Sequence, residues 1–210
     1  VGSEMCIRDS LSSFLNFYLT NVCEIALKYG GTIDKFIGDS VMIFFGDPDT
    51  KGAKEDAIAC CQMAMEMLSF LENNQQHFQD MYNFPEKLEI RVGIHNGLCN
   101  VGNFGSEQRL DYTAIGRTVN VAARLEQAAP KNSILVSSAI RNLIKNKFET
   151  SSPIEVKAKG IDKPIASYVL NRQEPQNTKV IKELDGLKLE YDPKKTDKNK
   201  LLEIISELEN

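Results

Sequence analysis

One stretch decides the fold: residues 30–45, which read GGTIDKFIGDSVMIFF. It holds two runs rich in β-branched and aromatic residues, 32–37 and 40–45, on either side of Gly38-Asp39. Glycine tolerates a positive φ and aspartate tolerates the left-handed region, so this dipeptide suits a two-residue turn. The pattern predicts an antiparallel hairpin with Asp39 at its tip, and turn geometry alone would explain that aspartate.

The segments on both sides of this hairpin follow a helical period. Residues 11–29 place apolar side chains at steps of three and four, and Gly30-Gly31 ends the pattern. Residues 54–78 repeat it over a longer stretch. Such a stripe is typical of an amphipathic helix with one buried face, and the methionines on the second stripe are expected to fill the core.

Downstream, short strands and helices alternate. Residues 88–94, the Asn96-Gly97 turn and residues 98–103 predict a second hairpin. The helix expected to start at Gly116 ends before Pro130. The further expected elements are strand 110–115, strand 133–136, helix 138–144, strand 154–156 and strand 165–170. The sum is a mixed α+β domain with hairpins rather than a regular βαβ winding.

The last part of the chain differs in composition. Residues 171–210 are rich in charge and are predicted to form a linker or tail with a terminal helix. That helix would carry an apolar stripe formed by Leu201, Leu202, Ile204, Ile205 and Leu208. The stripe would dock on the domain or on a partner helix, and a solvated tail with one marginal helix is the alternative.

Composition narrows the class of protein. With 210 residues, 42% of them apolar and 26% charged, the chain is neither collagen-like, disulfide-stapled nor wholly disordered. A net charge of −4 makes nucleic acid an unexpected partner. We find no secretory signal and no apolar run near the ~20 residues that span a bilayer. Five cysteines without C-x-x-C spacing fit buried thiols in a reducing compartment, so we expect a cytoplasmic location.

Several polar residues invite a chemical interpretation, each with an ordinary alternative. Asn120 and Arg124 are four residues apart, so they share a face near a helix start, which suits an anionic ligand. An exposed helix face explains them equally well. Lys35 within a strand is by itself a solvent-facing side chain. His95 is expected to be structural because no second histidine or cysteine lies nearby to complete a metal site.

Two strings carry a resemblance to a known family. They are KYGGTIDKFIGD at residues 28–39 and DYTAIGRTVNVAARLE at residues 111–126. Together, in this order, they closely resemble the class III adenylate/guanylate cyclase catalytic domain over about residues 11–170. The resemblance implies a ferredoxin-like, palm-like α+β domain that works as a head-to-tail homodimer with its active sites at the interface.

The reaction that this resemblance implies is intramolecular. The ribose 3′-oxygen of ATP attacks the α-phosphorus, and 3′,5′-cyclic AMP and pyrophosphate form for intracellular signalling. Two Mg²⁺ or Mn²⁺ ions, normally held by two aspartates, take part, and Asp39 matches the second aspartate. Asn120 and Arg124 match the pair that orients the ribose and neutralises the transition-state phosphate. Lys159 matches a lysine that contacts the terminal phosphates, with Lys157 as a near neighbour.

Base choice in the resembled family rests on two positions. Lys35 matches a lysine that accompanies adenine, where a glutamate accompanies guanine. Thr113 matches the partner position of a bacterial-type subgroup, where a hydroxyl can accept a hydrogen bond from the adenine amino group. The resemblance therefore implies ATP, with a guanylate cyclase as the alternative.

One element of that family is not found at the start of this chain. The family begins with a strand carrying F-x-D, whose aspartate is the first metal ligand, and no F-x-D precedes Asn16. Residues 1–10 read VGSEMCIRDS and resemble translated adapter sequence, so we expect a non-native start and a truncated domain. Without that central strand the polypeptide is expected to be poorly stable and nearly inactive. A truncated start would hide any upstream sensor or membrane domain, both of which are common in the family.

Three other functions stay open on the sequence. A catalytically inactive cyclase-like module would bind nucleotide or only dimerise, although the joint presence of Lys35, Asp39, Asn120 and Arg124 argues against it. A diguanylate cyclase would carry G-G-D/E-E-F, whereas TID follows the glycine pair here. A protein-interaction domain that uses the charged tail predicts no stabilisation by nucleotide.

Overall fold

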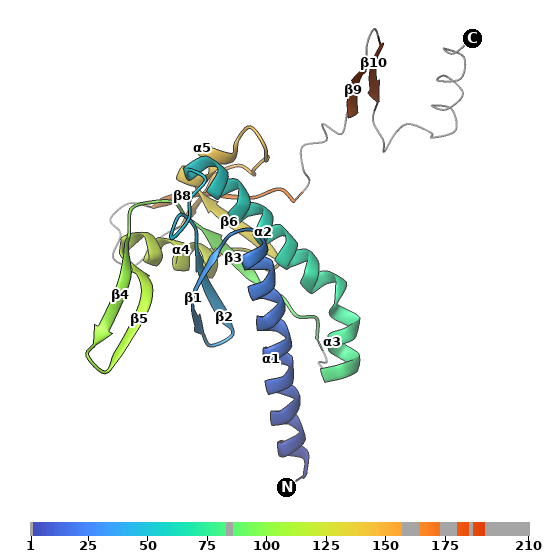
Figure 1. Ribbon diagram of the computed structural model, residues 1–210. Helices are drawn as coiled ribbons and strands as arrows, with labels where there is room; N and C mark the ends of the chain where they lie inside the picture. The colour runs from blue at the N-terminus through green and yellow to red at the C-terminus, as the bar shows by residue number, and fades with distance from the viewer. Residues whose placement is uncertain (1, 83–85, 157–163, 173–179, 185–186, 192–210) are drawn as a thin grey trace.

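The computed structural model describes residues 2–82, 86–156, 164–172, 180–184 and 187–191 (Figure 1). Side chains are described within residues 11–172 of these ranges. The helices are α1 Gly2–Lys28, α2 Ala53–Asn73, α3 Gln75–Tyr82, α4 Arg117–Ala128 and α5 Ser138–Ile144. The strands are β1 Thr32–Ile37, β2 Ser40–Phe44, β3 Arg91–Ile94, β4 Asn100–Ser106, β5 Arg109–Ile115, β6 Ser133–Ser137, β7 Ile154–Val156, β8 Ile165–Val169, β9 Val180–Leu184 and β10 Leu187–Tyr191.

The hairpin predicted from the opening stretch is confirmed. β1 and β2 are antiparallel, and Ile37 pairs with Ser40, so Gly38-Asp39 is the two-residue turn. Gly38 has a φ of 65°, which a residue with a side chain rarely adopts. The pairing register shifts between Ile33 and Lys35, which leaves one extra residue in β1 as a bulge.

The larger sheet has helices on both faces. Its strand order is β3-β6-β8-β7, with β3 and β6 parallel and the other pairs antiparallel. Ile134 and Val136 of β6 lie in a buried cluster with side chains of α2 and α5. Leu135 between them lies in a cluster with Val121 and Leu125 of α4. Because successive strand residues face opposite sides, α2 and α5 cover one face and α4 the other.

The predicted hairpin of residues 88–103 is wrong. β3 pairs in parallel with β6, while β4 pairs with β5 from Asn100 opposite Ile115 to Ser106 opposite Arg109. The alternation in 88–94 indicates a strand but not its partner, and β6 buries Ile94. The glycine of the Asn96-Gly97 signal serves a close approach instead, since a Cβ there would lie 2.8 Å from Thr118 Oγ1 of α4.

Two further boundaries differ from the sequence prediction. The helix expected over 54–78 is two helices, with a break at Asn74. β3 begins at Arg91 rather than at residue 88, because side chains rather than a neighbouring strand form hydrogen bonds with the backbone just before it. Gln75 bonds both the N–H and the C=O of Leu88, and Asn132 Oδ1 accepts from the N–H of Ile90.

The described strands form four sheets, of which the β1–β2 hairpin and the four-stranded sheet β3-β6-β8-β7 are here called the two half-sheets. Among these strands, β2 pairs with β1 alone and β3 with β6 alone, so each keeps one unpaired edge. Hairpin β4–β5 is a third, separate sheet that extends away from the layered body in Figure 1. The connection between the two half-sheets therefore rests on helix packing, chiefly of α1 and α2.

The ends of the chain bring two findings. α1 begins at Gly2, earlier than the predicted start at residue 11. Hairpin β9–β10 lies within the segment predicted as a linker, and the predicted terminal helix over 201–208 lies outside the described residues. In the part of the chain that the structure describes, no helix combines the length and apolar character needed to span a membrane.

Candidate active site

The structure brings Lys35 and Thr113 together through a residue that lies between them. The carboxylate of Asp34 in β1 accepts hydrogen bonds from Thr113 Oγ1, at 2.9 and 2.8 Å to its two oxygens, and from the backbone N–H of Ala114 at 2.9 Å. Lys35 Nζ lies 3.3 Å from Asp34 Oδ1. The Asp34 side chain is fully buried, whereas Lys35 is substantially exposed. Residues 79 positions apart thus share one cluster.

A second contact fixes the same two hairpins to each other. The Tyr112 hydroxyl of β5 donates a hydrogen bond to Asp47 Oδ1, in the loop after β2. The Tyr112 ring also lies 6.4 Å from the ring of Phe44, centroid to centroid. β5 is therefore held against β1 and β2 on both sides of Thr113.

Helix α4 presents the predicted polar pair. Asn120 is exposed and Arg124 half-buried, one helical turn apart, while Val121 and Leu125 face the core. Arg124 Nη1 donates to Gln127 Oε1 at 2.8 Å, which leaves other guanidinium N–H groups for a ligand.

The position of α4 depends on a glycine beneath it. A Cβ on Gly93 of β3 would lie 2.2 Å from the backbone N of Glu126 and 2.4 Å from the carbonyl oxygen of Ala122. No side chain fits in that space, so helix and strand backbones are in direct contact.

Asp39 lies exposed at the β1–β2 turn. Burial, and to a smaller degree the charge of Asp39, raise the pKa of Tyr18 in α1 to about 12. Tyr18 also packs against the same buried cluster as Val41, two residues after Asp39, so the turn lies near α1. No group of three histidine, cysteine, aspartate or glutamate side chains suited to a metal occurs among the described residues.

Not all predicted site residues meet within one chain. Among the described residues, no hydrogen bond or ion pair links Asp39 with Asn120 or Arg124. Lys159 and its neighbour Lys157 lie outside the described residues. Within the described residues, the chain thus assembles the Lys35 and Thr113 part of the predicted site and leaves Asp39 without a bond to Asn120 or Arg124.

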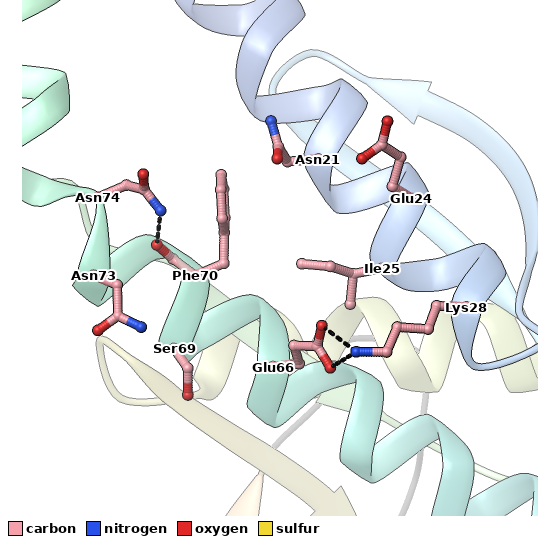
Figure 2. A pocket seen from close by; sticks show the side chains of 9 residues that line it. All are labelled: Asn21, Glu24, Ile25, Lys28, Glu66, Ser69, Phe70, Asn73 and Asn74. Atoms are coloured by element: carbon pink, nitrogen blue, oxygen red, sulfur yellow. Dashed lines mark hydrogen bonds and ion pairs between the residues drawn. The ribbon is translucent and has the colours of Figure 1, made fainter.

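A surface groove between α1 and α2 is separate from the candidate active site. It has a volume of about 440 Å³ and lies between α1 and α2 (Figure 2). Lys28 and Glu66 form an ion pair of 2.7 Å across it. None of the predicted site residues lines it.

His95 has the structural setting that the sequence analysis expected. Its Nδ1 lies 2.8 Å from Ser137 Oγ, and burial lowers the pKa of the imidazole. The cysteines follow the expectation in part: Cys61 is buried and burial raises the pKa of Cys60 to about 12, but Cys99 is exposed. The described cysteines form no disulfide.

Sequence reasoning missed that Asp34 links Lys35 to Thr113. A signal was present, because an acidic residue inside a β-rich run is uncommon unless it is paired. Its partner could not be identified, since Thr113 lies in a distant segment and in another hairpin.

Comparison with known proteins shows the family to which this chain belongs. The family model for the adenylate and guanylate cyclase catalytic domain matches residues 5–172. The chain is 34% identical over 160 residues to an adenylate cyclase of Anabaena cylindrica, which covers 74% of this chain and 31% of that protein. The chain thus spans less than a third of that curated relative.

Two solved structures are similar to the fold. The adenylyl cyclase CyaB from P. aeruginosa matches with a TM-score of 0.76 and 43% identity, over 80% of this chain and 85% of that one. The guanylyl cyclase Cya2 matches with a TM-score of 0.73 and 28% identity, over 81% and 85%. The chain belongs to the adenylate and guanylate cyclase catalytic domain family, the class III nucleotide cyclases, and has their α+β, palm-like fold.

Proposed function

We propose that the protein converts ATP into 3′,5′-cyclic AMP and pyrophosphate at sites formed between two copies of this chain. The observation that carries the proposal is the meeting of Lys35 and Thr113 at one buried carboxylate, in a chain of a nucleotide cyclase family. An ammonium donor and a hydroxyl oxygen side by side suit the edge of a nucleobase.

Each side chain has a distinct role in this mechanism. Lys35 donates a hydrogen bond to a ring nitrogen of adenine, and Thr113 accepts one from the amino group. The guanidinium of Arg124 neutralises charge that develops on the reacting phosphate, and the amide of Asn120 orients the ribose. Lys159 is proposed to contact the terminal phosphates.

Asp39 is the residue proposed to hold Mg²⁺ or Mn²⁺. It offers exposed oxygen donors, which hard cations prefer, and Mg²⁺ is commonly held by one or two carboxylates together with substrate phosphates. Among the described residues, Asp39 is the one acidic ligand proposed, and this fits a Mg²⁺ site that substrate phosphates complete. When bound, the metal supplies stabilisation of negative charge on the attacking oxygen and the phosphates.

The exposed apolar side chains of β4–β5 support a second copy as partner. Leu98 is 98% exposed at the start of this segment, and further large apolar side chains follow along the hairpin. They are Phe104, Leu110, Tyr112 and Ile115. A cluster of this kind on a projecting hairpin is typical of an interface. A symmetric pair would also supply Asn120 and Arg124 to the nucleotide of the partner.

The choice of ATP over GTP draws support from two sides. Lys35 and Thr113 offer the groups expected for adenine, and CyaB, at 43% identity, is named an adenylyl cyclase, whereas Cya2 is named a guanylyl cyclase at 28%. Intracellular signalling by a cytoplasmic catalytic domain follows as part of the proposal.

The test is product formation by the purified full-length protein. With Mg²⁺ or Mn²⁺ we expect cyclic AMP and pyrophosphate in equal amounts from ATP, and much less cyclic GMP from GTP. Binding is measured separately as a rise in the unfolding temperature on addition of ATP and Mn²⁺. Stabilisation without turnover would favour an inactive nucleotide-binding module. No stabilisation and no product would contradict the proposal.

A further inference from the structure

We infer that Asp34 is a specificity-determining positioning residue, which sets the hydrogen-bond polarity of Thr113 and thereby selects adenine over guanine. The inference rests on the proposed function, in which Lys35 and Thr113 face the base. Asp34 itself does not contact the nucleotide; it acts through these two neighbours.

The polarity of Thr113 follows from the contacts of its hydroxyl. Thr113 Oγ1 lies 2.9 and 2.8 Å from the two oxygens of Asp34. An ionised carboxylate can only accept hydrogen bonds, so the single hydroxyl proton of Thr113 points to Asp34. What remains on Thr113 Oγ1 is lone-pair density. A base that reaches this oxygen meets an acceptor.

Asp34 holds the lysine by the same carboxylate. Consecutive strand residues normally point to opposite faces, yet Lys35 Nζ lies 3.3 Å from Asp34 Oδ1. The shift of register in β1 at Asp34 accounts for this, because a bulge re-aims side chains. The ammonium is paired by charge with Asp34 on an exposed side chain, so its N–H groups stay available as donors.

The result is an acceptor oriented by Asp34 beside an ammonium donor. Adenine carries an amino donor at position 6 next to a ring-nitrogen acceptor, whereas guanine carries a carbonyl oxygen at position 6. With position 6 facing Thr113, the amino group of adenine donates to Thr113 Oγ1 and its ring nitrogen accepts from Lys35. The carbonyl oxygen of guanine would instead place its lone pairs against those of Thr113 Oγ1. A site that leaves polar groups unpaired with the wrong base discriminates strongly.

The amide variant separates polarity from shape. In Asp34→Asn, an amide oxygen at the position of Asp34 Oδ2 keeps the bond from the N–H of Ala114, and the amide NH2 at the position of Oδ1 then donates to Thr113 Oγ1. The hydroxyl proton of Thr113 becomes free to turn toward a carbonyl oxygen at position 6. We expect the ratio of kcat/KM for ATP to that for GTP to fall about tenfold to a hundredfold.

The experiment compares four variants of the full-length protein with both nucleotides. Thr113→Ser keeps the hydroxyl and should keep the wild-type ratio, whereas Thr113→Val removes it and should lower the ratio as Asp34→Asn does. The matched control is Asp111→Asn, an exposed aspartate on the same strand whose ion-pair partner is Arg109; it should leave the ratio unchanged. A role of Asp34 in folding alone would lower both activities together and leave the ratio as it was.

Two outcomes overturn the inference. One is a folded Asp34→Asn protein with the wild-type ratio; the other, decisive if Asp34→Asn does not fold, is an unchanged ratio in Thr113→Val. The ratio of dissociation constants for ATP and GTP, obtained from unfolding temperatures, gives the same test without turnover. A wild-type protein that forms no cyclic nucleotide counts against the proposed function, whereas normal turnover with an unchanged ratio counts against this inference alone.

Discussion

The candidate site has two halves that the chain treats differently. The buried Asp34 carboxylate accepts hydrogen bonds from the Thr113 hydroxyl and the Ala114 N–H, and Lys35 Nζ lies 3.3 Å from the same carboxylate. Asp39 and Asn120 are exposed on separate elements, and within the described residues no bond joins them. We call these the fixed half and the open half.

The difference has a physical cause. Groups that recognise a neutral base gain from being held in one orientation before the ligand arrives, because ordering a side chain on binding costs free energy. Groups that meet a triphosphate and metal ions carry charge, and burial without those partners would be costly. The open half is therefore the part that substrate, metal and a second copy have to complete.

The sharpest test of the open half mixes two inactive variants. We expect Asp39→Asn and Arg124→Ala each to lower cyclic AMP formation by about a thousandfold. Equal co-expression gives about half mixed dimers, each with one intact site of two, so about a quarter of the wild-type activity should return. Product formation in the purified mixture is the measurement.

A matched mixture serves as its control. Asn120 and Arg124 lie one turn apart on α4 and belong to the same copy in the proposed site, so Asn120→Ala mixed with Arg124→Ala leaves no intact site and should restore nothing. No restoration in the first mixture would show that one chain alone supplies the site, whereas restoration in the control mixture would show that Asn120 and Arg124 come from different copies. Both single variants should unfold within about 0.5 kcal/mol of wild type, because the changed side chains are exposed or half-buried.

A smaller effect is expected from moving α4 as a whole. In Gly93→Ala the new methyl group would meet the backbone of α4 at 2.2 Å, so the helix has to shift. We expect the free energy of unfolding to fall by about 1–3 kcal/mol and kcat to fall about a hundredfold, since a displacement near 1 Å misplaces Asn120 and Arg124. Denaturant unfolding and steady-state kinetics are the two measurements.

Gly102→Ala is the matched control for this change. The atom nearest to its added Cβ is a ring carbon of Phe104 at 3.8 Å, an ordinary contact. It should unfold and turn over like wild type. If Gly93→Ala lost stability without losing kcat, the placement of the open half would not depend on the contact of β3 with α4.

Local sequence predicted the elements of both halves but only part of their pairing. The hairpin with Asp39 at its tip and the helix with Asn120 and Arg124 followed from turn chemistry and periodicity, which act within a few residues. The false hairpin over 88–103 arose because alternation indicates a strand without naming its partner. β3 found that partner in β6, about 40 residues away, where Ile94 becomes buried.

The fixed half shows the same limit at the level of side chains. Lys35 and Thr113 could be singled out only through resemblance to a family, since each alone is an ordinary strand residue. The role of Asp34 depends on a one-residue bulge and on a contact 79 positions away, and neither leaves a mark in its neighbours. Long-range contacts of this kind have to be read from the structure.

The smallest predicted effect is the pH dependence of the free energy of unfolding. It concerns His95, which contacts Ser137 outside both halves of the site. Burial lowers the pKa of His95 below its ordinary 6.5, so the unfolded chain binds more protons at this residue as the pH falls below that value. The contribution of neutral His95 to the free energy of unfolding is complete above pH 6.5. It is lost as the pH falls below that value, by at most about 1.4 kcal/mol per pH unit. His95→Gln should reduce this slope just below pH 6.5 in denaturant titrations, whereas an unchanged slope would assign it to other groups. An NMR titration of the imidazole in the folded protein measures the same pKa directly.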